Sequence, residues 1–207
     1  MRGLHAMRAV ALAACFGFSG WSAAGDGVAF TAPKTALTEL EATVMPSGLA
    51  SLCRRDPAFC QPVHEDAHKL VLSPARWKLL RDVNQSVNHR IKSTTDQKLY
   101  GVAEYWTIPA SAGDCEDFVL LKRQILMGLG VPETSLLMTV VQDENGEGHA
   151  VLTIPTTAGD IILDNRRDEI LGWWATGYKF IKRQSAADPL RWVSLGREKL
   201  QATSIAS

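Results

Sequence analysis

The sequence lacks a long apolar run beyond its first residues, and its charge has no excess of either sign. After residue 24 no stretch of 18 consecutive apolar residues occurs, so we expect no membrane-spanning helix in that part of the chain. In the chain of 207 residues, 22 basic residues balance 22 acidic ones. Net charge therefore implies no polycationic surface, and we expect no nucleic-acid partner. Internal repeats and low-complexity segments are also absent, and the 46% of apolar residues is ordinary for a globular protein.

Residues 1–24 have the pattern of a secretory signal peptide. Arg2 and Arg8 give a positively charged N-terminal region, and residues 9–18 form an apolar segment. Residues 22–24 (Ser-Ala-Ala) offer small side chains for cleavage. The apolar segment is too short to span a bilayer comfortably, and an uncleaved anchor is the alternative. The leader contains two arginines and no acidic residue, so cleavage would leave 20 basic and 22 acidic residues. We predict a soluble exported protein.

Cysteine is scarce, with four residues in the chain. Cys15 lies in the predicted signal peptide, whereas Cys53 and Cys60 lie close together on either side of Pro57. In an oxidising compartment these two are expected to form a disulfide. Cys115 is then the odd cysteine, and an odd thiol in an exported protein is either reactive or buried and inert.

The mature chain is expected to contain one domain with a sizeable core. Residues 25–50 are rich in Ala, Thr, Gly and Pro and have weak periodicity, so we predict an extended N-terminal arm there. The domain is assigned to residues 51–200 and begins with the predicted disulfide loop at residues 51–62.

A short segment after this loop matches the H-E-x-x-H pattern of zinc proteases through His64, Glu65 and His68. On a helix the two histidines would share one face and could bind zinc, with the glutamate as base. The segment is short, because Ser-Pro at 73–74 interrupts it, and no downstream residue has a recognisable third-ligand spacing. A short polar helical turn on the surface is the preferred interpretation.

Two helices are predicted before the strands. Ser73 and Pro74 have the types of an N-cap and a first helical residue. The buried face of this first helix is expected to hold Trp77, Leu80, Val83, Val87 and Ile91. Its polar face is expected to hold Arg81, Asn84, Asn88 and Lys92. A second helix is predicted from about Asp114, its N-cap, to Leu129, with a buried face of Phe118, Leu121, Ile125 and Leu129.

Strands are predicted after the second helix, which Gly130 and Pro132 end. They are expected at residues 136–142, 149–154, 160–163, 178–182 and 191–195, with a hairpin loop at residues 143–148. Helices followed by an antiparallel meander predict an α+β architecture, with N-terminal helices packed on an antiparallel sheet.

Three residues in this arrangement have the types and the order of a thiol-based catalytic triad. Cys115 lies where the second helix begins, His149 opens one strand, and Asp164 closes the next strand of the same hairpin. A helix N-terminus favours the thiolate, a neighbouring imidazolium lowers the thiol pKa further, and a carboxylate holds the tautomer of the histidine. Asn165, adjacent to Asp164, is a second choice for that last role. A buried structural cysteine and a strand histidine are the alternatives to catalysis.

Carboxylates surround the cysteine at Asp114, Glu116 and Asp117. Without compensation they would raise the thiol pKa and repel one another. A hard divalent cation would remove both effects, and calcium suits oxygen ligands in irregular geometry. We therefore predict a calcium site built from some of these three residues; the alternative is that they cap the helix and face solvent.

Several segments together resemble the bacterial transglutaminase-like cysteine proteinases, over roughly residues 45–195. The resemblance rests on Gly-Asp-Cys-Glu-Asp-Phe at 113–118, Gly-His-Ala-Val-Leu at 148–152, Leu-Asp-Asn at 163–165, Val-Asn at 83–84 and 87–88, Tyr-Gly at 100–101, Trp106 and Pro109. It implies a papain-like α+β fold with a triad of Cys115, His149 and Asp164. It also implies calcium binding beside the cysteine, where Asp114 and Glu116 match the family's acidic positions and Asp117 is also available.

The resemblance further implies a cellular location, a substrate and a partner. The best-known members are periplasmic proteases of the LapG type, which cut large surface adhesins, typically near paired alanines, and so release biofilm. An inner-membrane receptor for cyclic di-GMP sequesters such proteases. A periplasmic location, a protein substrate such as a surface adhesin and such a receptor are therefore expected by analogy.

The chemistry expected of the triad is acyl transfer. The Cys115 thiolate would attack a peptide carbonyl, His149 would protonate the leaving amine, and water would hydrolyse the thioester. Backbone N–H groups at the helix start would stabilise the oxyanion, and Trp106 is expected to wall the cleft. If an amine replaced water, the site would act as a transglutaminase. A non-catalytic envelope binding module is the alternative from another class, and the zinc protease at His64 and His68 is a further one.

Overall fold

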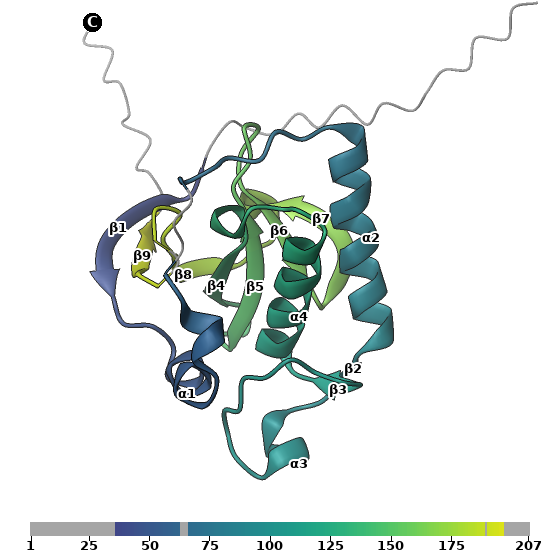
Figure 1. Cartoon of the computed structure of the whole chain (residues 1–207), viewed down its shortest axis with the longest axis vertical. Coiled ribbons are helices and arrows are strands. Elements are labelled where there is room, and N and C mark those ends of the chain that lie inside the picture. The colour runs from purple at the N-terminus through teal and green to yellow at the C-terminus, as the bar shows by residue number, and fades with distance from the viewer. Residues whose placement is uncertain (1–35, 63–65, 189, 197–207) are drawn as a thin grey trace, which may run out of the picture. The chain divides into compact units, whose positions relative to one another are not determined.

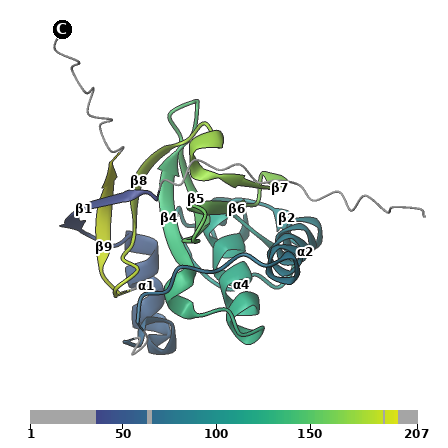
Figure 2. The ribbon, with the colours of Figure 1, turned by 90° about the horizontal axis from the view of Figure 1, so that it is seen from above.

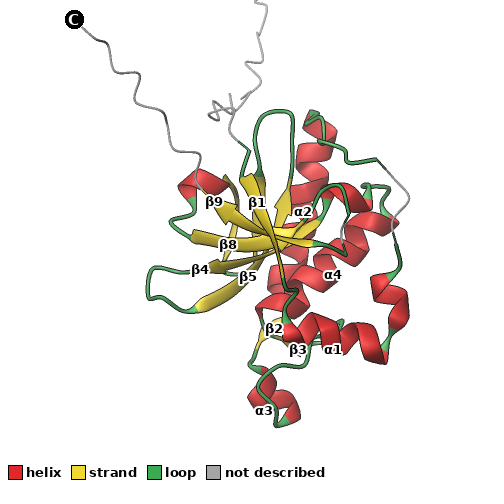
Figure 3. Ribbon diagram, turned by 90° about the vertical axis from the view of Figure 1, so that its left-hand side faces the viewer, coloured by secondary structure: helices red, strands yellow, loops and turns green. Residues whose placement is uncertain are grey.

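One antiparallel sheet of seven strands organises the chain, in a computed structural model that describes residues 36–62, 66–188 and 190–196 (Figure 3). All of these residues belong to one compact unit that spans residues 32–207. Across the sheet the strands follow one another in the order β1 (Thr38–Thr43), β9 (Trp192–Gly196), β8 (Lys179–Gln184), β4 (Leu137–Gln142), β5 (Gly148–Ile154), β6 (Ile161–Asp164) and β7 (Arg167–Gly172).

Three helices lie side by side on one face of this sheet (Figure 2): α1 (Ser47–Arg55), α4 (Cys115–Gly128) and α2 (Pro74–Arg90). The short helix α3 (Asp96–Tyr100) and the two-residue parallel strands β2 (Lys92–Ser93) and β3 (Ala112–Gly113) lie at the end of α4 where that helix begins (Figure 1). The predicted α+β architecture is confirmed. In the part of the chain that the structure describes, every helix is too short or too polar to cross a membrane.

Helix α2 begins where the sequence predicts. The Ser73 hydroxyl accepts a hydrogen bond from the Arg76 amide at 3.2 Å, and Pro74 occupies the first helical position. The predicted apolar face is buried apart from the half-buried Trp77. The predicted polar face is wrong at two positions, because Asn84 is fully buried and Asn88 is partly buried. Both contact the β6–β7 hairpin instead of solvent.

Helix α4 is buried around most of its circumference. Residues 116–123 are all buried, including two cations, Lys122 and Arg123. The predicted single apolar face is therefore too narrow, and it is wrong at its end, where Leu129 is 54% exposed while Leu126 is fully buried. Gly130, with φ of +82°, follows the helix in the left-handed conformation that favours glycine. The helix packs against β5 and α2.

Two separate sets of apolar side chains pack on the two faces of the sheet. The larger set joins the three helices to the helix-facing side chains of the strands, such as Leu152 and Ile154 of β5. The smaller set, with Val151 of the same strand, packs on the opposite face around Tyr178 and Phe180. The alternation along β5 explains why its central residues are buried on both faces.

The N-terminal part departs most from expectation. Within the predicted extended arm, residues 38–43 form the edge strand β1 paired with β9, and α1 already begins at Ser47. Residues 47–50 are therefore helical, which corrects that part of the arm. The predicted disulfide between Cys53 and Cys60 is formed. The predicted signal peptide lies outside the described residues and stays a prediction.

The predicted strands lie within one or two residues of their observed bounds, and β7 is a strand that the sequence did not predict. Residues 66–69 form no helical turn, so this part of the expected H-E-x-x-H helix is wrong, whereas His64 and Glu65 lie outside the described residues. The carbonyls of Asp66 and His68 accept hydrogen bonds from the hydroxyls of Thr134 and Ser135. Those bonds hold the segment extended along the short 3-10 helix at Glu133–Ser135.

Candidate active site

Cys115 is the first residue of α4, and the short β2–β3 pair aims the chain into this helix. The Thr94 amide donates to the Gly113 carbonyl at 2.8 Å, which fixes the chain two residues before the thiol. Gly113 tolerates no larger residue, because an added Cβ would lie 2.5 Å from Oδ2 of Asp117. The four N-terminal amides of a helix have no carbonyl partner within the helix, so the thiol lies at the positive end of the helix dipole.

His149 and Asp164 form a hydrogen-bonded pair across neighbouring strands. The β5–β6 register, with Leu152 opposite Leu163, places His149 and Asp164 diagonally across the ladder on the same face. Nε2 of His149 lies 2.9 Å from Oδ1 of Asp164, and both side chains are buried. The ring of Tyr178 contacts the imidazole edge-on with centroids 5.5 Å apart.

The Asp164 carboxylate has partners on both oxygens. Oδ1 also accepts from the Arg166 amide at 3.0 Å, and Oδ2 accepts from the Tyr178 hydroxyl at 2.7 Å. Burial acts to raise the pKa of Asp164, but hydrogen bonding and the charge of His149, with the other two donors, lower it to about 2. Asp164 is therefore ionised at neutral pH and can only accept, so Nε2 of His149 carries a proton. Nδ1 of His149 is buried and has no hydrogen-bond partner among the described residues.

Asn165, the second choice for orienting the histidine, does not take that role. Its Oδ1 is buried without a partner among the described residues, whereas Asp164 bonds the imidazole directly.

Cys115 and His149 line the same cleft, which has a volume of about 350 Å³. Its other walls come from the start of α1, the chain before α4, the first turn of α4, and strands β4, β5 and β8. They are formed by Pro46, Ser47, Glu104, Trp106, Glu116, Val140, Gly148, Ala150 and Lys182. Trp106 walls this cleft as the sequence predicts. Its indole packs against Gly48, where a Cβ would lie 2.2 Å from the ring, and its Nε1 donates to Glu104 at 2.9 Å.

The thiol itself faces carboxylates. Sγ of Cys115 donates to Oε2 of Glu116 at 3.2 Å, and the described residues contain no hydrogen bond between the thiol and His149. Burial raises the pKa of Cys115 well above its ordinary value, and the negative charge of Glu116 raises it further. The Ala150 main-chain N–H acts in the opposite direction. Without a compensating cation, the site therefore favours the neutral thiol.

Three carboxylates converge beside Cys115: Asp96, Asp114 and Glu116 each offer one oxygen, and these oxygens all lie within 4.8 Å of one another. Asp96 was missed by sequence reasoning, because it lies 18 residues upstream of Asp114 and carries no local motif. Asp117, which the sequence includes in the calcium site, is not in this group and accepts from the Thr107 amide at 2.8 Å. Asp114 does not cap the helix with its side chain, which instead accepts from the Asp96 amide at 3.2 Å.

The chemistry of this acidic group fits a hard cation. One oxygen each of Asp96, Asp114 and Asp117 is buried without a hydrogen-bond partner among the described residues. Burial raises the pKa of Glu116 to about 9, with the hydrogen bond and charge of Asp114 acting in the same direction. Burial likewise raises the pKa of Asp117 to about 7, although the Thr107 amide opposes it. Buried anionic oxygens that lack donors are the ligands that Ca²⁺ prefers.

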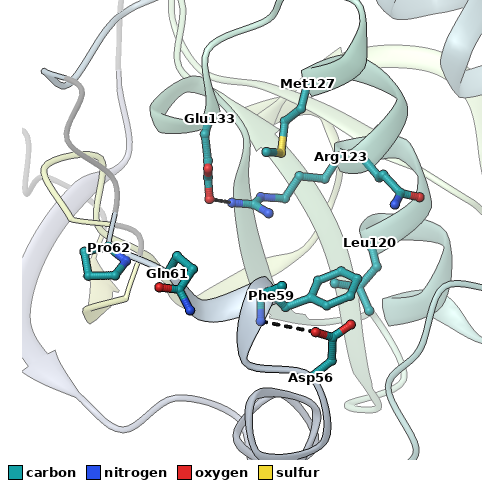
Figure 4. A pocket seen from close by; sticks show the side chains of 10 residues that line it. Asp56, Phe59, Gln61, Pro62, Leu120, Arg123, Met127 and Glu133 are labelled. Carbon is teal, nitrogen blue, oxygen red and sulfur yellow. Dashed lines mark hydrogen bonds and ion pairs between the residues drawn. The ribbon is translucent and has the colours of Figure 1, made fainter.

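Other candidate features lie away from this cleft. A larger pocket of about 660 Å³ opens between the disulfide-bonded segment, α4 and Glu133 (Figure 4). Arg123 reaches toward it and pairs with Glu133, and no triad residue lines it. His68 is exposed and belongs to no group of three potential metal ligands in the described part of the chain.

The sequence matches one known protein family. Residues 39–200 match the family model described as bacterial transglutaminase-like cysteine proteinase BTLCP. A comparison with curated proteins finds no match.

Solved structures of LapG from Legionella pneumophila are similar to the chain. One shares 28% identity over 55% of this chain and 65% of LapG, with a TM-score of 0.46. An EGTA-treated LapG shares 28% identity over 61% of this chain and 69% of LapG, with a TM-score of 0.48. A calcium-bound LapG shares 26% identity over 62% of this chain and 75% of LapG, also with a TM-score of 0.48. The first alignment takes in slightly less than two thirds of the LapG chain.

Proposed function

Because residues 39–200 match its model, this chain belongs to the bacterial transglutaminase-like cysteine proteinases, and we propose that it hydrolyses peptide bonds through Cys115, His149 and Asp164. The observation that carries this proposal is the pairing of His149. Nε2 is bonded to an ionised carboxylate, Nδ1 has no partner among the described residues, and His149 and Cys115 line the same cleft. That is the arrangement a general base for a thiol requires.

The proposed reaction is acyl transfer to water. Nδ1 of His149 takes the proton of Cys115, and the thiolate sulfur bonds to the carbonyl carbon of the substrate. The amide C–N bond then breaks, and the imidazolium gives its proton to the leaving amine. Water, deprotonated by the same nitrogen, hydrolyses the thioester and regenerates the thiol.

Asp164 keeps the proton of His149 on Nε2 and stabilises the imidazolium in both halves of the reaction. Backbone N–H groups at the start of α4, including that of Cys115, are proposed to bind the oxyanion. The Ala150 amide, which lowers the pKa of the thiol, would stabilise the thiolate before attack.

We propose that Asp96, Asp114 and Glu116 hold calcium, with Asp117 adding negative charge from the same helical turn. The spacing of their oxygens and the unpartnered oxygens of Asp96 and Asp114 support this set. Bound calcium would supply positive charge that offsets the carboxylates next to the thiol. Glu116 would then no longer accept a hydrogen bond from the Cys115 thiol, and the thiol could transfer its proton to His149.

The location and the substrate are proposed from the family. We propose that the protein is exported to the periplasm, where it cuts a large surface adhesin, and that an inner-membrane receptor for cyclic di-GMP sequesters it. The disulfide between Cys53 and Cys60 supports an oxidising compartment.

Cleavage of a peptide library would test the proposal. The protein is exported from a bacterial host, its N-terminus is determined by mass spectrometry, and it is then incubated with peptides from a digested bacterial proteome. New peptide ends should form with calcium, and EGTA and Cys115→Ala should each abolish them. Asp164→Asn should lose most of the activity, whereas Asn165→Ala, at the neighbouring position, should retain it.

Retained cleavage in Cys115→Ala would overturn the thiol mechanism. Products joined to an added amine, in place of free carboxyl ends, would mean that the site is a transglutaminase. A wild-type protein that cleaves nothing and whose thiol reacts with iodoacetamide only at high pH would point to a binding module.

A further inference from the structure

A buried lysine lies on the catalytic helix and takes no part in the proposed reaction. Lys122 follows Cys115 by seven residues, which is two turns of α4, so both lie on nearly the same side of the helix. Its side chain is almost completely buried, and Nζ donates to Oδ1 of Asn84 at 2.7 Å. Burial lowers the pKa of Lys122 to about 7, while the charges of Asp164 and Asp168 raise it. A buried ammonium costs stability, so its polar contacts need explanation.

Asn84 connects this lysine to the β6–β7 hairpin. The side chain of Asn84 is fully buried, and its Nδ2 donates to the carbonyls of Arg167 and Asp168, each at 3.1 Å. The two carbonyls can only accept, so they require the amide nitrogen of Asn84, and the amide oxygen then faces Lys122. A protonated Lys122 donates to that oxygen. Lys122 and the two carbonyls therefore hold the Asn84 amide in the same orientation.

The hairpin that Asn84 holds begins with the triad aspartate. Asp164 is the last residue of β6 and pairs with Arg167, the first residue of β7, across a two-residue turn. Asn88, one turn after Asn84 on α2, donates to the carbonyls of Asp164 and Arg167, both at 3.0 Å. Two asparagines of α2 thus hold both ends of the turn from which the Asp164 carboxylate reaches His149.

We propose that Lys122 is a positioning residue that acts through Asn84 and the β6–β7 turn to keep Asp164 hydrogen-bonded to His149. The hydrogen bond between Lys122 and Asn84 sets the distance between α4, which carries Cys115, and the β6–β7 turn, which carries Asp164. Its charge also stabilises the ionised form of Asp164 in a buried environment. The inference rests on the proposed protease function for its kinetic consequence, but its structural consequence can be measured without a substrate.

Lys122→Met tests the proposal, because methionine fills similar space without the charge or the donor. The matched control is Arg123→Met, which removes the next buried cation on α4; Arg123 bonds the carbonyl of Leu136 and the side chain of Glu133, away from the triad. The first readout is the low-field proton resonance of the His149 ring N–H that bonds Asp164, identified by its absence in His149→Ala. The second readout is kcat and KM on the best peptide from the library.

Lys122→Met should weaken or abolish the His149 resonance and lower kcat by between about tenfold and a hundredfold, the range expected when a catalytic group is displaced by up to about 1 Å. KM should stay the same, because Lys122 does not line the cleft. Arg123→Met should leave the resonance and kcat unchanged. An unchanged resonance and unchanged kcat in Lys122→Met would overturn the proposal.

The double variant Lys122→Met with Asn84→Leu separates positioning from stability, and it carries the test if the single variant does not fold. Replacing both partners by apolar side chains removes the Asn84 oxygen that Lys122→Met leaves without a donor, but the Asp168 carbonyl also loses its Asn84 donor. Thermal stability should therefore recover in part. With positioning, kcat stays low in the double variant; recovery of kcat together with stability would overturn the proposal. If the wild type cleaves no peptide, the protease proposal fails, while the His149 resonance still decides the role of Lys122.

Discussion

Chelating calcium should make the stability of this protein fall as pH rises. Removing calcium would leave three neighbouring carboxylates without a counter-charge. They belong to Asp96, Asp114 and Glu116, whose oxygens lie within 4.8 Å of one another. At that distance and an effective dielectric constant of about 20, each pair of full charges repels by about 3.5 kcal/mol, so three ionised groups repel by about 10 kcal/mol. A whole domain is stable by only about 5–15 kcal/mol. The metal-free protein must therefore keep protons on this group.

The shifted pKa values give the direction of the effect. Burial and the neighbouring Asp114 raise the pKa of Glu116 to about 9, and burial raises that of Asp117 to about 7. Both pKa values in the folded protein exceed those in the unfolded protein, which are 4.5 for Glu116 and 3.8 for Asp117. At a pH between the unfolded and the folded pKa of each group, the folded state therefore binds more protons than the unfolded state. The stabilisation from these protons is fully present below about pH 4 and is lost as pH rises through 7 and then 9. For Asp117 alone the loss is on the order of 4 kcal/mol.

Denaturant unfolding from about pH 5 to pH 9, in calcium and in EGTA, measures this loss. With EGTA the free energy of unfolding should decrease with pH, and the stabilisation by calcium should grow over the same interval. Calorimetric titration with calcium near pH 7, in buffers of different ionisation enthalpy, should report about one released proton or more, because Glu116 is protonated there without metal.

Two variants make the measurement specific. Glu116→Gln should remove most of the proton release. Asp160→Asn also removes a buried carboxylate, but one that is paired with Arg183 at 2.8 Å. It should lower stability equally with and without calcium. Calcium binding without proton release, or EGTA-treated protein that gains stability as pH rises toward 9, would refute the reasoning, because the carboxylates would then be ionised without a cation.

Two further predictions concern the surroundings of the triad, and a third concerns the disulfide. Tyr178→Phe removes the hydroxyl that donates to the triad aspartate at 2.7 Å, and it should lower kcat severalfold with KM unchanged in peptide cleavage. Gly48→Ala drives a methyl group into the indole of Trp106, so KM should rise; an unchanged KM would show that the indole does not shape the cleft. Serine at both Cys53 and Cys60 should lower the free energy of unfolding by about 2–3 kcal/mol, measured by denaturant titration, because the loop they close is short.

The parts of the fold that the sequence could predict depend on local signals. Ser73 and Pro74 start α2 where expected, because capping and a fixed φ act within one turn. His149 and Asp164 lie on neighbouring strands as expected, because a hairpin loop and alternating burial set their register. Edge strand β1 was not predicted as a strand, since its partner β9 lies about 150 residues later in the chain.

The parts that the sequence could not predict are polar groups buried by distant partners. Helical periodicity places Asn84 on a solvated face, because it counts an amide as polar and cannot detect a hairpin 83 residues away. Asp96 carries no motif, and the β2–β3 pair and the contact with Asp114 bring it to the thiol. Hydrophobic pattern thus predicts the layers of this fold, whereas the site depends on long-range polar pairing.

Buried polar atoms without a partner indicate where the site is suited to bind a group from outside the chain. A buried polar atom without a partner is costly, and most buried atoms near the triad, such as both oxygens of Asp164, are paired. Nδ1 of His149 and Oδ1 of Asp114 are not paired with any described residue. His149 lines the cleft with Cys115, and Asp114 belongs to the group of three carboxylates. The unpaired nitrogen therefore suits the proton transfer that we propose, and the unpaired oxygen suits the proposed cation.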